Sequence, residues 1–227
     1  MYDIDAVLFD LDGTLCRHAR DAEAAYRCAF DRIGAEPFGE PDSLWAALDG
    51  PPNPDDRVGH LGAGLARVAA QHGRNDIDPI ALAEALVDEI DEIGVEFLPG
   101  ATDAVDAAAA RGKTGIITNG PAVHQERKVR SLGLGERVDV VVYAGDLARR
   151  KPHAAPFREA LAALDVPAAR ALYVGDSLAY DVAGAHNAGL RVAWLRDADA
   201  DEGPGEYQPD HVLDGMGELV ALLEGPV

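Results

Sequence analysis

The sequence has very few cysteines and no long apolar run. Its only cysteines are Cys16 and Cys28, which cannot form a disulfide framework or a four-thiolate zinc site. No stretch of the sequence approaches the roughly 18 consecutive apolar residues of a membrane span. The first residues, 1–5, include no basic side chain and do not resemble a signal peptide. We therefore expect a reduced, cytoplasmic protein.

Lysine is also scarce, and basic residues in general are outnumbered by acidic ones. Three lysines and seventeen arginines face 40 acidic residues, which gives a formal net charge of −20. Such a charge repels nucleic acid and anionic membranes, so neither is expected as the main partner. The acidic residues are spread along the whole chain, a composition typical of halophilic proteins with strongly acidic surfaces.

An acidic surface of this kind predicts that folding requires salt. Raising KCl from about 0.1 M to about 3 M shortens the Debye length from about 10 Å to about 3 Å or less, which screens the repulsion between surface carboxylates. We expect the melting temperature to rise with KCl, and thermal unfolding at both concentrations measures it. A melting temperature that is constant or falls would contradict the halophilic interpretation.

Hydrophobic patterning divides the chain into an alternating part and a helical part. Apolar runs alternate with helical stretches after residue 98, and another run occupies 4–9, as in a parallel sheet with helical crossovers. Residues 16–97 show only helical patterns. We predict an α/β, Rossmann-like parallel-sheet core of residues 1–15 and 98–227, with an inserted all-helical domain of residues 16–97. The expected strands are 4–9, 114–118, 138–143, 171–174, 191–195 and 211–213.

Polar side chains follow four of the expected strands, near the point where each strand ends. Parallel sheets bind ligands at the carboxyl ends of their strands, where side chains from separate strands meet. The sequence therefore brings carboxylates, one lysine and neutral hydrogen-bond donors to one edge of the sheet. In chain order these residues are Asp10, Asp12, Thr118, Asn119, Gly120, Lys151, Asp176 and Asp181.

Carboxylates crowded at one edge repel each other unless a cation lies between them. Hard oxygen ligands suit Mg²⁺, which retains water ligands and accepts an oxygen of a substrate phosphate. Lys151, Thr118 and Asn119 suit an anionic group beside the metal. This combination predicts metal-assisted phosphoryl chemistry, in which one carboxylate is the nucleophile and its neighbour handles the proton.

These segments resemble the four ordered motifs of the haloacid dehalogenase-like (HAD) hydrolases. The resemblance extends from residue 4 to about residue 195, and the helical insertion lies where the family carries its cap domain. Residues 117–120 and 174–195 look most like the phosphatases and the pyrimidine 5′-nucleotidase-like members. The motifs are Asp10-Leu11-Asp12-Gly13-Thr14, Thr118-Asn119-Gly120, Lys151-Pro152 and Gly175-Asp176-Ser177 with Asp181.

The resemblance implies a Mg²⁺-dependent phosphatase that acts on a small soluble phosphate ester through an aspartyl phosphate. Asp10 would be the nucleophile. Asp12 would protonate the leaving oxygen and then deprotonate the attacking water, while its backbone carbonyl binds the metal. Asp10 and Asp176 would be further metal ligands, and Asp181 would be a ligand or the partner of one. The protein is expected to be a monomer or a small homo-oligomer.

The resemblance also implies which groups hold the phosphoryl oxygens, with one departure from the family pattern. Where the family often has an acidic residue and a proline after the lysine motif, this chain has His153 and Ala154. The lysine itself is present, and it would neutralise charge between the nucleophile and the phosphate. The residues expected to contact phosphate are Thr118, Asn119, Gly120 and Lys151.

Other functions share parts of this residue set. A phosphosugar mutase would use every core residue. A metal-independent 2-haloacid dehalogenase would use the Asp10 nucleophile but would leave Asp12 without a task. A receiver-like signalling domain, which is phosphorylated on an aspartate and binds partners, fits less well because receivers carry no large helical insertion.

Overall fold

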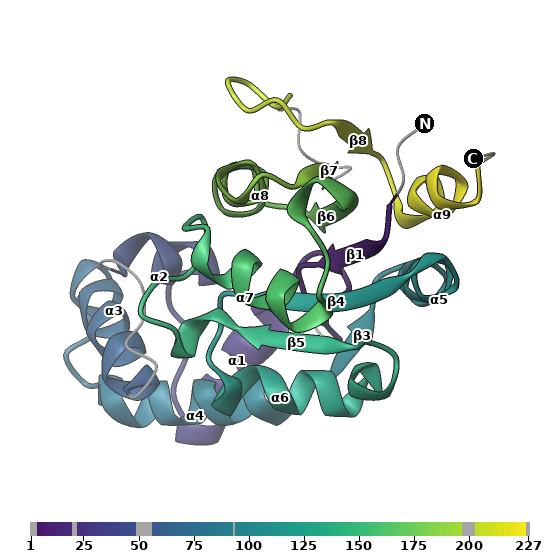
Figure 1. Ribbon diagram of the computed structural model, residues 1–227. Helices are drawn as coiled ribbons and strands as arrows, with labels where there is room; N and C mark the ends of the chain where they lie inside the picture. The colour runs from purple at the N-terminus through teal and green to yellow at the C-terminus, as the bar shows by residue number, and fades with distance from the viewer. Residues whose placement is uncertain (1–3, 20–21, 49–55, 93, 197–202, 226–227) are drawn as a thin grey trace. The chain divides into compact units, whose positions relative to one another are not determined.

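The computed structural model describes residues 4–19, 22–48, 56–92, 94–196 and 203–225 of the chain (Figure 1). The chain divides into two compact units. One unit is formed by residues 1–17 together with 95–227, and the other is formed by residues 18–94.

The first unit contains a six-stranded sheet in which every neighbouring pair of strands is parallel. The strand order is β5-β4-β1-β6-β7-β8, so the first strand of the chain lies in the middle. This arrangement confirms the predicted α/β class with a parallel sheet. The strands are β1 (Ala6–Phe9), β4 (Lys113–Thr118), β5 (Val140–Tyr143), β6 (Ala171–Gly175), β7 (Arg191–Leu195) and β8 (His211–Leu213).

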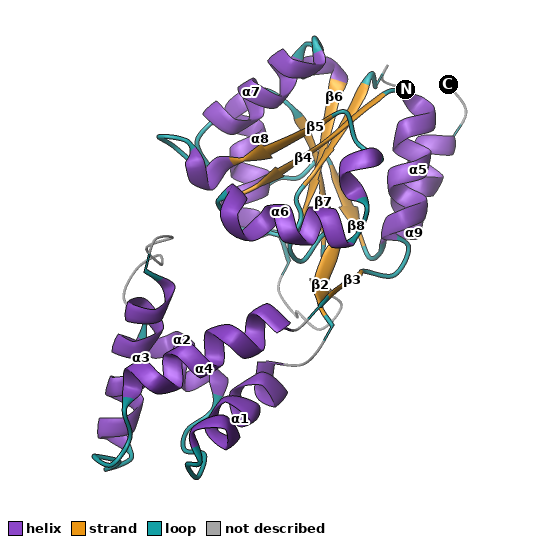
Figure 2. Ribbon diagram, turned by 90° about the horizontal axis from the view of Figure 1, so that it is seen from below, coloured by secondary structure: helices purple, strands orange, loops and turns teal. Residues whose placement is uncertain are grey.

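Helices cover both faces of this sheet (Figure 2). One face packs against α5, α6 and α9, and the opposite face packs against α7 and α8. The helices are α5 (Ala101–Arg111), α6 (Ala122–Ser131), α7 (Ala155–Leu164), α8 (Ala183–Ala188) and α9 (Met216–Glu224). Shorter turns are η1 (Leu134–Glu136), η2 (Ala144–Asp146), η3 (Ala168–Arg170) and the π-helical turn η4 (Leu178–Val182).

Strand β1 shows why the sequence forms a sheet that is buried on both sides. Successive side chains of a strand point to opposite faces. Val7 and Phe9 pack into the cluster on the α5 and α9 side, whereas Ala6 and Leu8 pack into the cluster on the α7 side. All four are at most 1% exposed. A short run without polar interruption is therefore the pattern that this position requires.

The second unit is a helical domain with its own apolar core. Helix α4 packs against both α1 and α3. In this core the Phe30 ring makes edge contacts with Tyr26 and Phe38, at centroid distances of 5.1 and 4.9 Å. The helices are α1 (Ala22–Ile33), α2 (Pro41–Ala47), α3 (Arg57–Gln71) and α4 (Pro79–Glu92).

A second, two-stranded sheet pairs β2 (Cys16–His18) with β3 (Val95–Phe97). These two strands lie within residues 16–97, which were predicted to be all-helical. Each is three residues long, too short for an alternating pattern to be distinguished from a loop.

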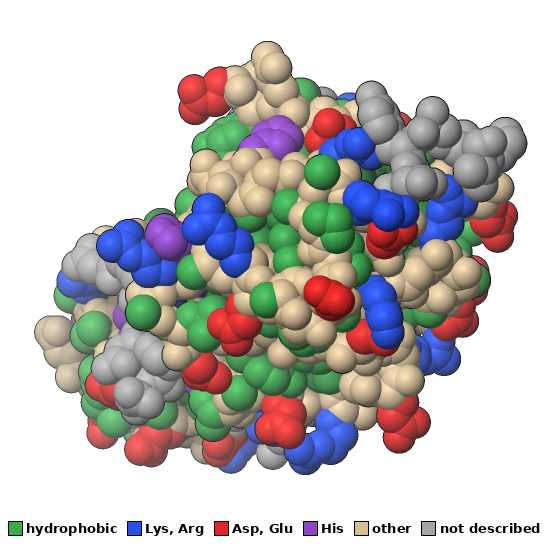
Figure 3. All heavy atoms as spheres, in the orientation of Figure 1, with side chains coloured by type: hydrophobic (Ala, Val, Ile, Leu, Met, Phe, Trp, Pro, Cys, Tyr) green, Lys and Arg blue, Asp and Glu red, His purple; other side chains and the backbone are tan. Residues whose placement is uncertain are grey.

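The charged residues lie mainly at the surface. On the face drawn in Figure 3, acidic side chains are scattered among basic ones and do not gather in one patch. Within the described part of the chain, no helix combines the length and the apolar character needed to cross a membrane.

Candidate active site

The site lies at the carboxyl ends of β1, β4 and β6. Strand β1 pairs with β4 on one side and with β6 on the other, and Phe9 lies opposite both Ile116 and Val174. The residues that follow these strands therefore emerge side by side. Because the sheet order reverses around β1, this edge is the switch point at which open parallel sheets bind ligands.

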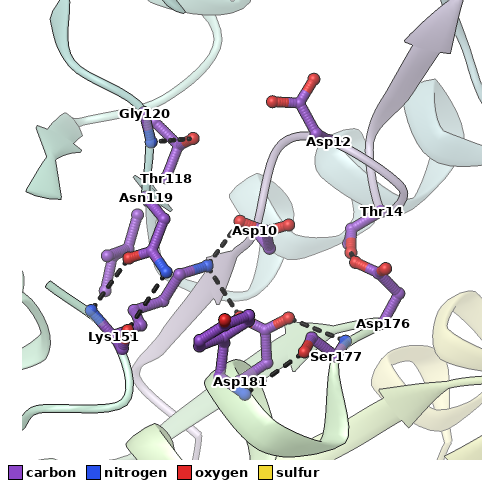
Figure 4. Close-up of polar contacts among 12 residues, drawn as sticks. Asp10, Asp12, Thr14, Thr118, Asn119, Gly120, Lys151, Asp176, Ser177 and Asp181 are labelled. Carbon is purple, nitrogen blue, oxygen red and sulfur yellow. Dashed lines mark hydrogen bonds and ion pairs between the residues drawn. The ribbon is translucent and has the colours of Figure 1, made fainter. Parts of the chain in front are cut away.

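A buried ion-pair network links Asp10, which follows β1, and Asp181, which follows β6, to Lys151 in the loop between η2 and α7 (Figure 4). The Lys151 ammonium donates hydrogen bonds to Asp10 Oδ1 at 2.5 Å and to Asp181 Oδ1 at 2.7 Å. It also lies 3.0 Å from the Tyr173 hydroxyl, which in turn donates to Asp181 Oδ1 at 3.0 Å. Burial alone would lower the pKa of Lys151, but the Asp10 and Asp181 carboxylates raise it above its usual value, so the ammonium stays charged.

Asn119 fixes the backbone that carries Lys151. Its side-chain amide donates to the Lys151 carbonyl at 3.1 Å and accepts from the Lys151 backbone N–H at 2.9 Å. Asn119 is one of the residues expected from the sequence to contact phosphate. In the structure its side-chain amide is directed to the lysine loop, which places Lys151 beside Asp10, and the contact of residue 119 with phosphate stays a prediction.

Asp181 enters the site from the π-helical turn η4. Its Oδ2 accepts from the Ser177 backbone N–H at 2.9 Å, and the residue is 1% exposed. A Cβ atom on Gly175 would overlap the Asp181 carboxyl group, so glycine is required there for this approach.

A residue in the turn that follows β1 holds the Asp176 side chain in place. The Thr14 hydroxyl donates to Asp176 Oδ1 at 2.9 Å. Gly13 in the same turn has a φ of +82°, and a Cβ atom at this position would collide with the Asp176 carboxylate. Burial and the nearby Asp181 carboxylate raise the pKa of Asp176.

Asp10, Asp176 and Asp181 together form an oxygen cluster that fits a divalent cation. One carboxylate oxygen from each lies within 4.8 Å of the others. Burial, which is the largest cause, and the nearby Asp181 carboxylate raise the pKa of Asp10 to about 7, although the Lys151 ammonium lowers it. For Asp10 and Asp176, burial and the repulsion from Asp181 together outweigh the attraction of the Lys151 ammonium, so a further positive charge would stabilise the ionised carboxylates. Mg²⁺ prefers oxygen ligands of this kind and would supply the missing charge.

Asp12 and Thr118 lie apart from this cluster, on the side of helix α6. Figure 4 shows the Asp12 carboxylate turned away from Asp10. It accepts hydrogen bonds from Lys128 and Gln125, each at 2.6 Å. The Thr118 hydroxyl accepts from the same Gln125 amide at 2.9 Å.

Several side chains that contact the expected site residues were not predicted from the sequence. Lys128 carried a usable signal, because it is one of only three lysines and lies three residues after Gln125 on a helix that follows a motif. Thr14 is part of a recognised motif, but its contact with Asp176 spans 162 residues and has no local signature. Tyr173 lies inside a buried strand, where an aromatic residue is ordinary.

Replacing Lys151 by methionine is expected to destabilise the first unit. The change leaves buried carboxylates without their cation, and breaking a buried pair in this way costs about 3–5 kcal/mol. Guanidinium unfolding measures the loss, and added Mg²⁺ should restore part of it. Lys113→Met is the matched control, because it removes an exposed lysine-aspartate pair and should cost about 1 kcal/mol or less. Equal stability of the two variants would contradict the buried network.

Comparisons with known proteins identify the family to which this sequence is similar. The family model described as haloacid dehalogenase-like hydrolase matches residues 4–189. The chain is 32% identical over 174 residues to the pyrimidine 5′-nucleotidase YjjG of Escherichia coli, covering 73% of this chain and 76% of that protein. It is 35% identical over 224 residues to the plasmid phosphoglycolate phosphatase of Cupriavidus necator, covering 96% of this chain and 92% of that protein.

A solved structure shows the same fold. The chain is 30% identical to the 2-haloacid dehalogenase of Pseudomonas syringae pv. Tomato, with a TM-score of 0.60 over 96% of this chain and 99% of that one. The family match covers most of the sequence, and the matched region contains every motif residue at the sheet edge. This protein therefore belongs to the haloacid dehalogenase-like hydrolases.

Proposed function

We propose that the protein is a Mg²⁺-dependent phosphatase that hydrolyses a small soluble phosphomonoester. One observation carries the proposal: three carboxylates and the buried ammonium of Lys151 meet at the carboxyl ends of the strands of the parallel sheet. This set offers a nucleophile, a place for a cation and a fixed positive charge for an anionic group. The phosphatase and nucleotidase names of the relatives support the same chemistry.

The first half of the proposed reaction transfers the phosphoryl group to Asp10. Because Lys151 binds Oδ1 of Asp10, Oδ2 is the atom that attacks phosphorus. The bond to the leaving oxygen breaks as Asp12 gives that oxygen a proton. The Thr118 hydroxyl and the backbone N–H groups after β4 would hold the phosphoryl oxygens.

The second half of the reaction hydrolyses the aspartyl phosphate. Asp12, now a carboxylate, takes a proton from water as the water attacks phosphorus. Phosphate leaves and the Asp10 carboxylate is restored. Mg²⁺, held by Asp10, Asp176 and Asp181 with the Asp12 carbonyl, would neutralise the negative charge of the phosphoryl group. Lys151 favours the ionised form of Asp10, since it lowers the pKa of this carboxyl against the effect of burial, and it would hold the carboxylate in position.

Removing the metal is expected to abolish phosphate release reversibly. Metal ions of this type contribute several kcal/mol to transition-state stabilisation, which corresponds to a loss of about 10²-fold or more in turnover. Phosphate release is measured before chelation, in chelator and after dialysis into Mg²⁺, at high KCl. Full activity in chelator would contradict the metal requirement.

The substrate is to be identified with a panel of phosphate esters. The names of the relatives suggest 2-phosphoglycolate and pyrimidine nucleoside monophosphates as first members, with sugar phosphates beside them. A kcat/KM at least about tenfold above the others would identify the preferred class. Uniformly negligible turnover on all of them at saturating Mg²⁺ would contradict the proposal.

A dehalogenase is the second candidate, because the chain is 30% identical to a structurally similar 2-haloacid dehalogenase. That reaction would also begin with attack by Asp10, on carbon in place of phosphorus. It would give no task to Asp12 or to the acidic cluster. Halide release from a 2-haloacid in chelator distinguishes the two functions.

A further inference from the structure

Helix α6 directs two polar side chains toward Asp12. Gln125 and Lys128 are three residues apart and therefore lie on the same face of the helix. The Lys128 ammonium donates to Asp12 Oδ1 and the Gln125 amide donates to Asp12 Oδ2, both at 2.6 Å. A carboxylate held at both oxygens cannot rotate freely about its side chain.

Gln125 also connects Asp12 to the end of β4. The same Nε2 atom lies 2.9 Å from the Thr118 hydroxyl, and Gln125 is 6% exposed. Its Oε1 is buried and has no hydrogen-bond partner within the described part of the chain. Exchanging the amide oxygen and nitrogen would place Oε1 against the Asp12 carboxylate, so this orientation is the favourable one. The two donors of Nε2 therefore bridge Asp12 and Thr118.

Gly120 is the residue that lets Gln125 reach this position. A Cβ atom on Gly120 would overlap the Gln125 amide group. Glycine at this point of the Thr118-Asn119-Gly120 motif thus has a steric role, which is to leave space for the bridging side chain.

We propose that Lys128 and Gln125 are positioning residues that fix the Asp12 carboxylate for proton transfer and tie it to the phosphoryl-binding end of β4. The proposal rests on the proposed function, in which Asp12 is the acid and base. Each carboxylate oxygen has two lone pairs, so one stays available for the transferred proton while the other accepts the fixing bond. A misplacement of about 1 Å of a reacting group costs on the order of 10²-fold in rate.

The competing explanation is that Lys128 binds the substrate phosphate directly. Its side chain is 19% exposed, so solvent reaches it. A residue that acts through Asp12 loses its effect once Asp12 is inactive, whereas a residue that binds substrate keeps its effect in every background. A double-mutant cycle separates these cases.

The experiment measures kcat and KM for Lys128→Met and for Gln125→Leu, each in the native and the Asp12→Asn background. In the native background we expect kcat on an alkyl phosphate to fall about 10- to 10²-fold with KM unchanged, and less on an aryl phosphate, whose leaving oxygen needs little protonation. In the Asp12→Asn background we expect no further loss. Lys128→Arg, which retains the charge and a donor, should recover part of kcat.

The control for these substitutions is a lysine outside the site. Lys113→Met removes a lysine-aspartate pair at the opposite end of β4 and should leave both constants unchanged. A loss of equal size in both backgrounds, or a rise in KM, would overturn the positioning role and leave the proposed function intact. Full activity of Asp12→Asn would overturn both. Should Lys128→Met fail to fold, Gln125→Leu tests the same proposal, because it removes the hydrogen bond to the other oxygen of the Asp12 carboxylate.

Discussion

Replacing Asp10 by asparagine is expected to reduce phosphate release to the uncatalysed background. The amide cannot attack phosphorus, so no covalent intermediate forms, and loss of a nucleophile costs on the order of 10⁶-fold. The fold should persist, because asparagine has the same shape and can still accept from Lys151. Steady-state phosphate release, with unfolding followed in parallel, measures both expectations.

The control for this substitution is Asp106→Asn. Asp106 forms an exposed pair with Arg137 and lies on α5, away from the strand ends. Its removal should leave turnover unchanged and should change the free energy of unfolding by about 1 kcal/mol or less. Substantial turnover by Asp10→Asn would mean that another group, or water alone, attacks the substrate.

Replacing Asp12 by asparagine is expected to lower turnover by about 10²- to 10⁴-fold, the usual contribution of a general acid or base. The change retains the Asp10 nucleophile and the backbone carbonyl at position 12. Formation of the aspartyl phosphate from an aryl phosphate should therefore survive better than its hydrolysis, which needs a base. Rapid-quench kinetics with aryl and alkyl phosphates compares the two steps, and equal losses on both substrates would contradict an acid role.

The strands of the six-stranded sheet and the motif residues could be predicted because both leave local patterns. Residues 6–9 are apolar without interruption, as a strand covered on both faces requires, and polar residues begin where β1 ends. Since parallel strands end at one edge, the sequence also predicts that Asp10 and Asp176 lie near each other. The structure places them in one oxygen cluster, while their catalytic and metal-binding roles stay predictions.

The side-chain network could not be predicted because its contacts join distant segments. Gln125 and Lys128 meet Asp12 across 113 and 116 residues, and the sequence alone does not show which donor faces which carboxylate. The position of Asn119 illustrates the same limit. Its residue type suits a phosphate ligand equally well, yet its amide holds the Lys151 backbone on both sides.

The covalent intermediate tests the central claim most directly. The Asp12→Asn protein, mixed with an aryl phosphate and Mg²⁺ and quenched in acid, should carry one added phosphoryl group. Peptide mass spectrometry should locate this group on Asp10, and Asp10→Asn should carry none under the same conditions. A phosphoryl group on another residue, or rapid turnover with no covalent phosphate at any time point, would contradict catalysis by Asp10.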